Sequence, residues 1–249
     1  MSATKKPSEV EAEFFAGRPA DLNWTLHVKD SSGASRKFEG VDWEVLSRFG
    51  AVRNVVVCGA DGKPAFDRPE YREAPAVNVV AWGRTNDGVI KVGVIHEARP
   101  HADDPRNPES REAVVVGQIP MGFKDKILGK FEPELDAATR EVREETGAVV
   151  VGVFQPQHPY QNPNPTFVAS WTDLLFVEVD LEQIEQIKPH HGELIYKAEY
   201  ISVPELLRRI RNGEYEGALY RAATTLSILM IFFATFPEHF CTVDSKSSK

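Results

Sequence analysis

One short stretch of this chain, residues 140–147, combines three glutamates with two arginines and reads Arg-Glu-Val-Arg-Glu-Glu-Thr-Gly. If the stretch is helical, Glu141, Glu144 and Glu145 lie three and four residues apart, so their carboxylates share one face. Like charges at this spacing repel, and the single guanidinium of Arg140 does not balance them. Hard divalent cations prefer carboxylate oxygens, so the pattern predicts a site for Mg²⁺, with Mn²⁺ as a second option. The alternative is a solvated acidic helix face, as in most Glu-rich segments.

Together with an earlier glutamate, this stretch resembles the box of the Nudix hydrolases, G-x5-E-x7-R-E-U-x-E-E-x-G-U, in which U is a bulky aliphatic residue. The matching positions are Glu132, Arg140, Glu141, Val142, Glu144, Glu145 and Gly147. Lys126 stands where the box begins with glycine, and taking Gly122 as its equivalent implies a four-residue insertion within 123–131. Because of this insertion, Glu134 competes with Glu132 for the first glutamate position. Ala148 replaces the last aliphatic residue.

The resemblance implies roles for these residues in metal-assisted hydrolysis of a phosphoric anhydride. Glu141 and Glu145 would be direct metal ligands, Glu132 a further ligand, and Glu144 either a ligand or a base beside the metal. Arg140 would orient a glutamate, although a surface ion pair is the alternative.

A narrower resemblance, to the ADP-ribose pyrophosphatases, depends on two further segments. Arg99-Pro100 is followed about twenty residues later by Gln118-Ile119-Pro120-Met121-Gly122, where Gln118 stands in place of the usual glutamate. Arg99 is then the candidate to bind a substrate phosphate through two parallel hydrogen bonds, or else a solvated arginine at a strand end. Gly122 would let the backbone approach the pyrophosphate closely.

The general base is expected outside the box, because members of this subfamily often carry it on a late loop. Glu193, which follows His190-His191-Gly192, is the first candidate, and Glu144 is the second. The two histidines would be surface residues or phosphate contacts. In the proline-rich segment 156–165 and just after it, Tyr160 or Phe167 would stack on a base or simply pack within a loop.

Composition narrows the class of protein. The chain has 249 residues and a net charge of −8, which argues against nucleic acid or an anionic membrane as a partner. Cys58 and Cys241 fit neither a metal knuckle nor a redox pair, and the charged N-terminus does not read as a secretory signal, so a cytoplasmic location is expected. The apolar segment 222–236 is shorter than the roughly twenty residues that a membrane helix needs, so a buried helix is expected there.

The elements that must position these residues follow from hydrophobic periodicity. The pattern predicts a leader at 1–21, a small N-terminal β subdomain at 22–75 that is a possible dimerisation surface, a hydrolase domain at 76–240 and a tail at 241–249. Within 22–75 a helical turn around 42–49 is possible. In the hydrolase domain, strands are expected at 77–82, 89–96, 113–119, 149–154, 170–179 and 194–202, and helices from Pro133 to Gly147, at 204–211 and at 217–236. The expected fold class is α/β (α+β), a Nudix-type α/β/α sandwich with a mixed sheet.

The sequence favours a Mg²⁺-dependent hydrolase that cleaves the pyrophosphate of a nucleoside diphosphate linked to another group, with ADP-ribose preferred. A nucleotide sugar, a dinucleoside polyphosphate or a noncanonical nucleoside triphosphate is the alternative substrate. A non-catalytic Nudix-fold nucleotide sensor is the alternative class. A cytoplasmic homodimer is expected in either case.

Overall fold

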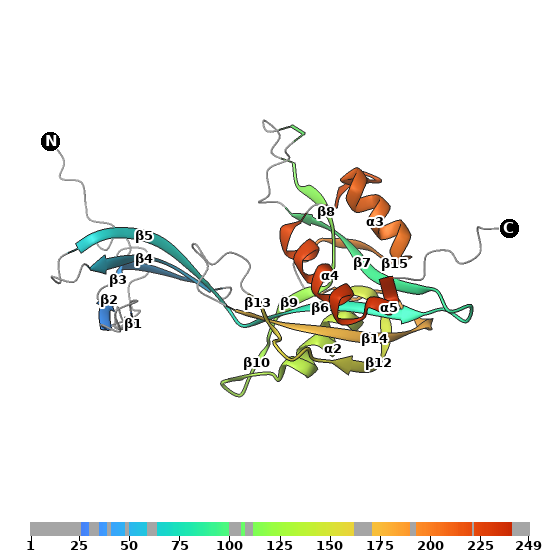
Figure 1. Ribbon diagram of the computed structural model, residues 1–249, viewed down its shortest axis with the longest axis horizontal. Helices are drawn as coiled ribbons and strands as arrows, with labels where there is room; N and C mark the ends of the chain where they lie inside the picture. The colour runs from blue at the N-terminus through green and yellow to red at the C-terminus, as the bar shows by residue number, and fades with distance from the viewer. Residues whose placement is uncertain are drawn as a thin grey trace. The chain divides into compact units, whose positions relative to one another are not determined.

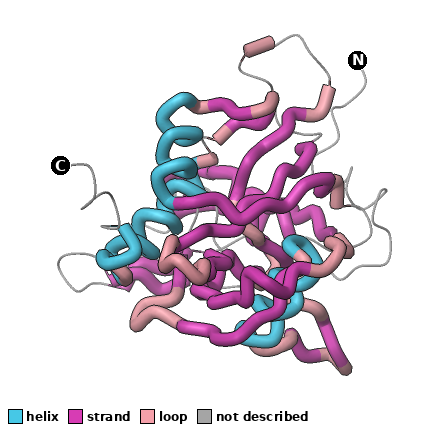
Figure 2. Tube along the Cα trace, turned by 90° about the vertical axis from the view of Figure 1, so that its right-hand side faces the viewer, coloured by secondary structure: helices cyan, strands magenta, loops and turns pink. Residues whose placement is uncertain are grey.

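A computed structural model describes residues 26–29, 35–38, 41–47, 50–58, 64–99, 106–107, 112–161, 171–189, 193–220 and 222–240 (Figure 1). The expected leader and tail, and with them Cys241, lie outside these residues, as do Pro100, His190, His191 and Phe167. The described elements fall into two compact units, one holding the strands up to Pro75 and the other those from Ala76 onwards. Strands make up most of the described chain (Figure 2).

The first unit consists of antiparallel strands. β1 (Leu26–Lys29) pairs with β2 (Ser35–Phe38), and β3 (Val41–Ser47), β4 (Gly50–Cys58) and β5 (Pro64–Glu73) form a three-stranded sheet in that order. The possible helical turn at 42–49 is therefore wrong over the described residues. Val41, Trp43 and Val45 alternate with polar or charged residues, and this period of two suits a strand paired along β4.

The second unit is built on a mixed sheet in which β12, β14, β6, β7, β8, β17 and β16 are neighbours in that order. β14 runs parallel to β6 and β17 runs parallel to β8, whereas the other pairs are antiparallel. The branches are β13 on β14, β15 on β7 and β9 on β6. The strands are β6 (Ala76–Arg84), β7 (Ile90–Arg99), β8 (Val114–Gln118), β9 (Met121–Phe123), β12 (Ala148–Phe154), β13 (Tyr160–Gln161), β14 (Thr172–Ile184), β15 (Ile195–Ser202), β16 (Glu214–Tyr215) and β17 (Ala218–Leu219).

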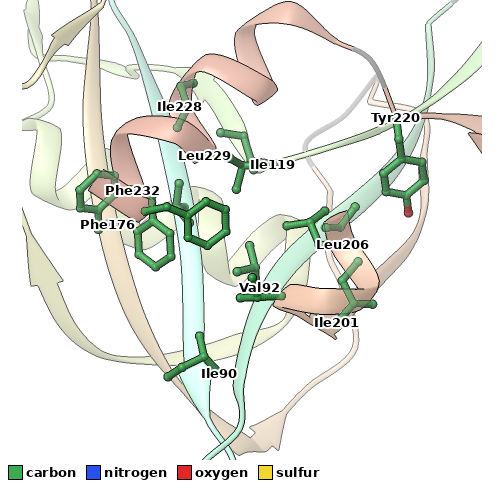
Figure 3. Close-up of a cluster of buried hydrophobic side chains, with 14 of the residues drawn as sticks. Ile90, Val92, Ile119, Phe176, Ile201, Leu206, Tyr220, Ile228, Leu229 and Phe232 are labelled. Atoms are coloured by element: carbon green, nitrogen blue, oxygen red, sulfur yellow. The ribbon is translucent and has the colours of Figure 1, made fainter. Parts of the chain in front are cut away.

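Helices pack on both faces of this sheet, as expected for an α/β/α sandwich. Alternate residues of β6 show the two faces: Val79 packs with α2 (Glu134–Thr146), and Val80 packs on the side of α3 (Val203–Asn212) and α4 (Ala223–Thr235). The hydrophobic core on the α3 and α4 side of the sheet contains the large side chains of Phe176, Leu206 and Phe232 (Figure 3). A short helix, α5 (Pro237–Phe240), follows α4.

Two boundaries differ from those expected by at least five residues. The helix expected at 217–236 begins at Ala223, because residues 214–219 form the hairpin β16–β17, whose turn places Glu216 and Gly217 at φ of 51° and 81°. β14 continues to Ile184 instead of ending at 179, paired with β12. Among the residues that the structure describes, no helix is long and apolar enough to cross a bilayer.

The residues between Gly122 and Glu132, where the sequence indicated an insertion, form a small hairpin. β10 (Lys126–Ile127) pairs with β11 (Lys130–Phe131) across a turn at Leu128 and Gly129, whose φ angles of 50° and 84° are both left-handed. Two successive left-handed residues suit a two-residue hairpin loop. The Leu128 side chain at the tip is fully exposed.

Candidate functional site

The helix α2 carries the acidic stretch, and its two ends are fixed by backbone chemistry. It begins after Pro133 and ends at Gly147, which has φ of 70° and donates its N–H to the Arg143 carbonyl at 3.0 Å. A left-handed residue at a helix end favours glycine because other residues are strained there. A Cβ at Gly147 would also lie 2.1 Å from the Glu185 carbonyl oxygen.

The chain that follows β14 is tied to this end of α2. The Glu185 N–H donates to the Gly147 carbonyl at 2.7 Å, and the Lys188 N–H donates to the Glu144 carbonyl, also at 2.7 Å. Further along, the Ala98 N–H of β7 donates to the Leu194 carbonyl at 3.0 Å. These bonds hold both ends of the segment between β14 and β15, in which Glu193 lies.

Three carboxylates meet where this segment approaches α2. Oxygen atoms of Glu141, Glu145 and Glu193 lie within 4.8 Å of one another. Glu141 and Glu145 are buried, and Glu193 is partly buried. Glu145 accepts a hydrogen bond from the Met121 N–H at 3.0 Å, which fixes one of its oxygens against β9.

Gly122 makes room for this group. A Cβ at Gly122 would lie 1.9 Å from Oε1 of Glu141, so any other residue would displace that carboxylate. A side chain at position 122 would therefore collide with a neighbouring carboxylate, a constraint that sequence reasoning missed. The expected contact of Gly122 with a pyrophosphate stays a prediction.

The electrostatics of the three-carboxylate group suit a divalent cation. Burial raises the pKa of Glu141 to about 7 and, with the charge of Glu141 added, raises the pKa of Glu145 well above its ordinary value. Oε2 of Glu141 is buried and has no hydrogen-bond partner among the described residues. Carboxylates crowded together in this way ionise readily only when a cation is present. The donor set, oxygen only, is the one that Mg²⁺ and Mn²⁺ prefer.

Arg140 organises the remaining acidic residues of the box. Its Nη2 donates to Oε1 of Glu132 at 2.5 Å, and its Nη1 donates to Glu141 at 2.8 Å and to Glu144 at 3.1 Å. Nη2 also donates to the Phe123 carbonyl at 2.9 Å. Burial alone would lower the pKa of Arg140. The hydrogen bond to Glu132 and the charges of Glu132 and Glu141 outweigh burial and raise this pKa.

The expected metal ligands thus form two groups that share Glu141, which also accepts from Arg140. Glu141 and Glu145 lie with Glu193, whereas the carboxylates of Glu132 and Glu144 face Arg140. Glu134, the competitor of Glu132, instead lies 3.6 Å from Lys124.

A second polar group lies on β7 and β8. Glu97 Oε2 accepts from Gln118 Nε2 at 2.6 Å and lies 2.8 Å from Arg99 Nη2. Burial raises the pKa of Glu97; the charge of Arg99 opposes this increase, and the charge of Glu193 adds to it. Sequence reasoning missed Glu97, although its position two residues before Arg99 places both on one face of a strand.

The remaining candidate that can be placed is Tyr160, in β13, whose side chain is exposed.

One comparison with known protein families gives a match over more than half of the chain. A family profile described as the NUDIX domain matches residues 76–221. No curated protein matches the chain. A solved structure of an ADP compounds hydrolase is 14% identical and has a TM-score of 0.50 over 88% of this chain and 98% of that chain, a likeness of fold alone.

Two further structures have lower TM-scores. A NUDIX hydrolase from Nitrosomonas europaea is 18% identical, with a TM-score of 0.38 over 65% of this chain and 90% of its own. The NUDIX domain of NrtR from Shewanella oneidensis, solved with ADP ribose, is 11% identical, with a TM-score of 0.40 over 66% of this chain and 88% of its own.

Proposed function

Since the chain belongs to the NUDIX family of hydrolases, whose profile spans more than half of it, we propose that it is a Mg²⁺-dependent pyrophosphohydrolase. The proposed substrate is a nucleoside diphosphate linked to another group, with ADP-ribose first. The observation that carries the proposal is the meeting of Glu141, Glu145 and Glu193 within 4.8 Å. The hydrolase domain is proposed to run from 76 to 240.

In this proposal Glu141 and Glu145 hold the cation, and Glu193 lies beside them. Bound Mg²⁺ would neutralise charge on the phosphate oxygens and make the phosphorus more electrophilic. Arg140 orients Glu141 through the bond at 2.8 Å, and Glu132 and Glu144 fix Arg140 in turn. Mn²⁺ is a second option because it shares the preference for carboxylate oxygens.

The attacking water must lose a proton as its oxygen bonds to phosphorus and the bridging P–O bond breaks. Glu193 is the first candidate to accept that proton, because it is the least buried member of the three-carboxylate group. Glu144, with about 31% of its side chain exposed and paired with Arg140, is the second. General base catalysis typically contributes about 10²–10⁴-fold in rate.

The substrate is proposed from the residues around the centre. Arg99 lies at the end of β7 with 42% of its side chain exposed, so part of its guanidinium is open to a phosphate. The resemblance of Arg99-Pro100 and of the segment ending at Gly122 to the ADP-ribose pyrophosphatases makes ADP-ribose the first compound to test. We further propose a homodimer that pairs through 22–75, in the cytoplasm.

One set of assays tests this function. The purified chain is incubated with Mg²⁺ and ADP-ribose, nucleotide sugars, dinucleoside polyphosphates or nucleoside triphosphates, and the products are identified by mass. We expect ADP-ribose to yield AMP and ribose 5-phosphate. Oxygen-18 water identifies the attacked phosphorus.

Variants assign the residues. Glu145→Gln should abolish turnover, and Glu193→Gln should lower kcat with little change in substrate affinity. Glu178→Gln, an exposed glutamate of β14, is the matched control and should keep the wild-type rate. A wild-type rate in Glu145→Gln refutes the metal site.

If Glu144→Gln, and not Glu193→Gln, shows the loss of kcat, the general base lies in the box. Binding of ADP-ribose by a wild-type chain that turns over none of the compounds would mean a sensor.

A further inference from the structure

Glu97 occupies a place in the site that the box does not explain. It lies in β7, and its side chain is 10% exposed. A buried carboxylate is costly unless hydrogen-bonded and paired, so its partners indicate its purpose. Both partners bind the same oxygen: Gln118 donates to Oε2 at 2.6 Å, and Arg99 Nη2 lies 2.8 Å from it.

The backbone that carries Glu97 is held on the opposite face as well. His96, the preceding residue, is buried, and its Nε2 lies 2.8 Å from the Tyr220 hydroxyl and 3.2 Å from Oε1 of Glu199. On the other side of β7, β15 pairs Ile195 opposite Glu97. The Glu97 carboxylate therefore projects from a fixed point, and Arg99, with 42% of its side chain exposed, is its more exposed partner.

The amide at position 118 matches the carboxylate at position 97. A carboxylate only accepts hydrogen bonds, whereas a glutamine side chain also donates. An ionised glutamate at 118 would repel the Glu97 carboxylate and could not donate a hydrogen bond to it. Gln118 donates that bond through its amide. Position 118 lacks the glutamate expected from the resemblance, and the neighbouring strand instead carries a carboxylate at Glu97, two residues before Arg99.

We propose that Glu97, held by Gln118, is a positioning residue for Arg99. The buried carboxylate holds one side of the guanidinium, and its remaining N–H groups face a phosphate of the substrate. This inference rests on the proposed function, in which Arg99 binds that phosphate. Without the ion pair, the Arg99 side chain would sample many rotamers. Substrate binding would then have to order this side chain, and that entropic cost would weaken binding.

Kinetics of single and double variants test the inference. Glu97→Gln should raise KM for ADP-ribose about ten-fold, as for loss of a charged hydrogen bond, and change kcat less than three-fold. Arg99→Ala should raise KM by at least as much. In the Arg99→Ala background, Glu97→Gln should have little further effect, because the residue through which it acts is absent.

A charge swap provides a matched control. Glu97→Gln with Gln118→Glu keeps one amide, one carboxylate and the net charge, but moves the carboxylate to β8. Position 118 pairs opposite Ile95, four residues from Arg99, so the moved charge lies farther from the guanidinium. The swap should keep the thermal midpoint of the wild-type chain and still show the raised KM.

The results that would overturn the inference are distinct. An additive effect of Glu97→Gln in the Arg99→Ala background would show that Glu97 acts independently of Arg99. A large kcat loss together with weaker Mg²⁺ binding would make Glu97 a metal ligand instead. If wild-type chain does not hydrolyse ADP-ribose, the proposed substrate fails, and the cycle is then measured with the compound that is hydrolysed. If no compound is hydrolysed, crystal structures of wild-type and Glu97→Gln chains decide it, and an unmoved Arg99 overturns the inference.

Discussion

At the scale of single residues, the site is built from side chains that would be unfavourable elsewhere. Glu145 is buried beside two other carboxylates, and burial raises its pKa well above the ordinary value of 4.5. A carboxyl group with a raised folded-state pKa stabilises the fold at low pH and loses that contribution as pH rises through the folded pKa. Without metal, this residue therefore weakens the fold at neutral and higher pH.

Replacing Glu145 should consequently stabilise the metal-free chain while abolishing its activity. Glutamine accepts the Met121 N–H but does not ionise, so in EDTA at pH 8 Glu145→Gln should melt a few degrees above wild type, since about 1 kcal/mol shifts the midpoint by roughly 2–4 °C. The difference should shrink as pH falls toward 4.5, the ordinary value. Calorimetry across pH checks this, with Glu178→Gln as the control.

Gly122 gives a second prediction at this scale. In Gly122→Ala the new Cβ would lie 1.9 Å from Glu141 Oε1, so the carboxylate must move. We expect kcat/KM to fall about 100-fold, as for an ångström-scale misplacement of a catalytic group. Gly152→Ala, whose nearest neighbour is Glu178 at 3.7 Å, is the control and should be near wild type. Equal activity in both variants would contradict the role given to Gly122.

At the scale of elements, the sequence predicted those whose ends carry local signals. Pro133 and Gly147 bound α2 as expected, because a fixed φ and a left-handed φ are properties of single residues. The hairpin at 214–219 was missed, because its two strands are only two residues long and its turn places Glu216, not a glycine or asparagine, at a positive φ. Glu97 was missed because its role depends on a contact with Gln118, 21 residues away on the next strand.

The end of α2 offers a prediction with an internal control. Gly147 and Gly88 have similar φ angles, 70° and 85°, but only at Gly147 would a Cβ meet another atom, the Glu185 carbonyl oxygen at 2.1 Å. Gly88→Ala should cost about 1 kcal/mol of unfolding free energy, and Gly147→Ala roughly 1–3 kcal/mol more because of overpacking. Denaturant unfolding measures both. Equal losses would show that the Glu185 contact is unimportant.

At the scale of the whole molecule, the folding of the mixed sheet and α2 brings together the candidate site residues from distant parts of the chain. α2 supplies two carboxylates, the segment before β15 supplies the third, and β7 supplies Arg99. A site assembled from several elements forms only in the folded chain. Binding at such a site stabilises the fold by mass action.

Metal should therefore stabilise the chain as a whole. Mg²⁺ at a hundred times its dissociation constant should add about 2.7 kcal/mol to the free energy of unfolding at pH 8. Glu145→Gln should lose most of this increment, although it is the more stable chain in EDTA. Thermal midpoints with and without Mg²⁺ measure the difference. An equal response in both chains would place the bound cation elsewhere.

The small hairpin β10–β11 has a practical consequence. It leaves and rejoins the domain at one place, where Glu132 and Asp125 exchange bonds of 2.9 Å and 2.8 Å. Its length is thereby uncoupled from the spacing between Gly122 and α2. A peptide epitope or a fluorophore-bearing loop could therefore be inserted between Leu128 and Gly129. The insertion would place a label near the candidate site and leave the rate of hydrolysis unchanged.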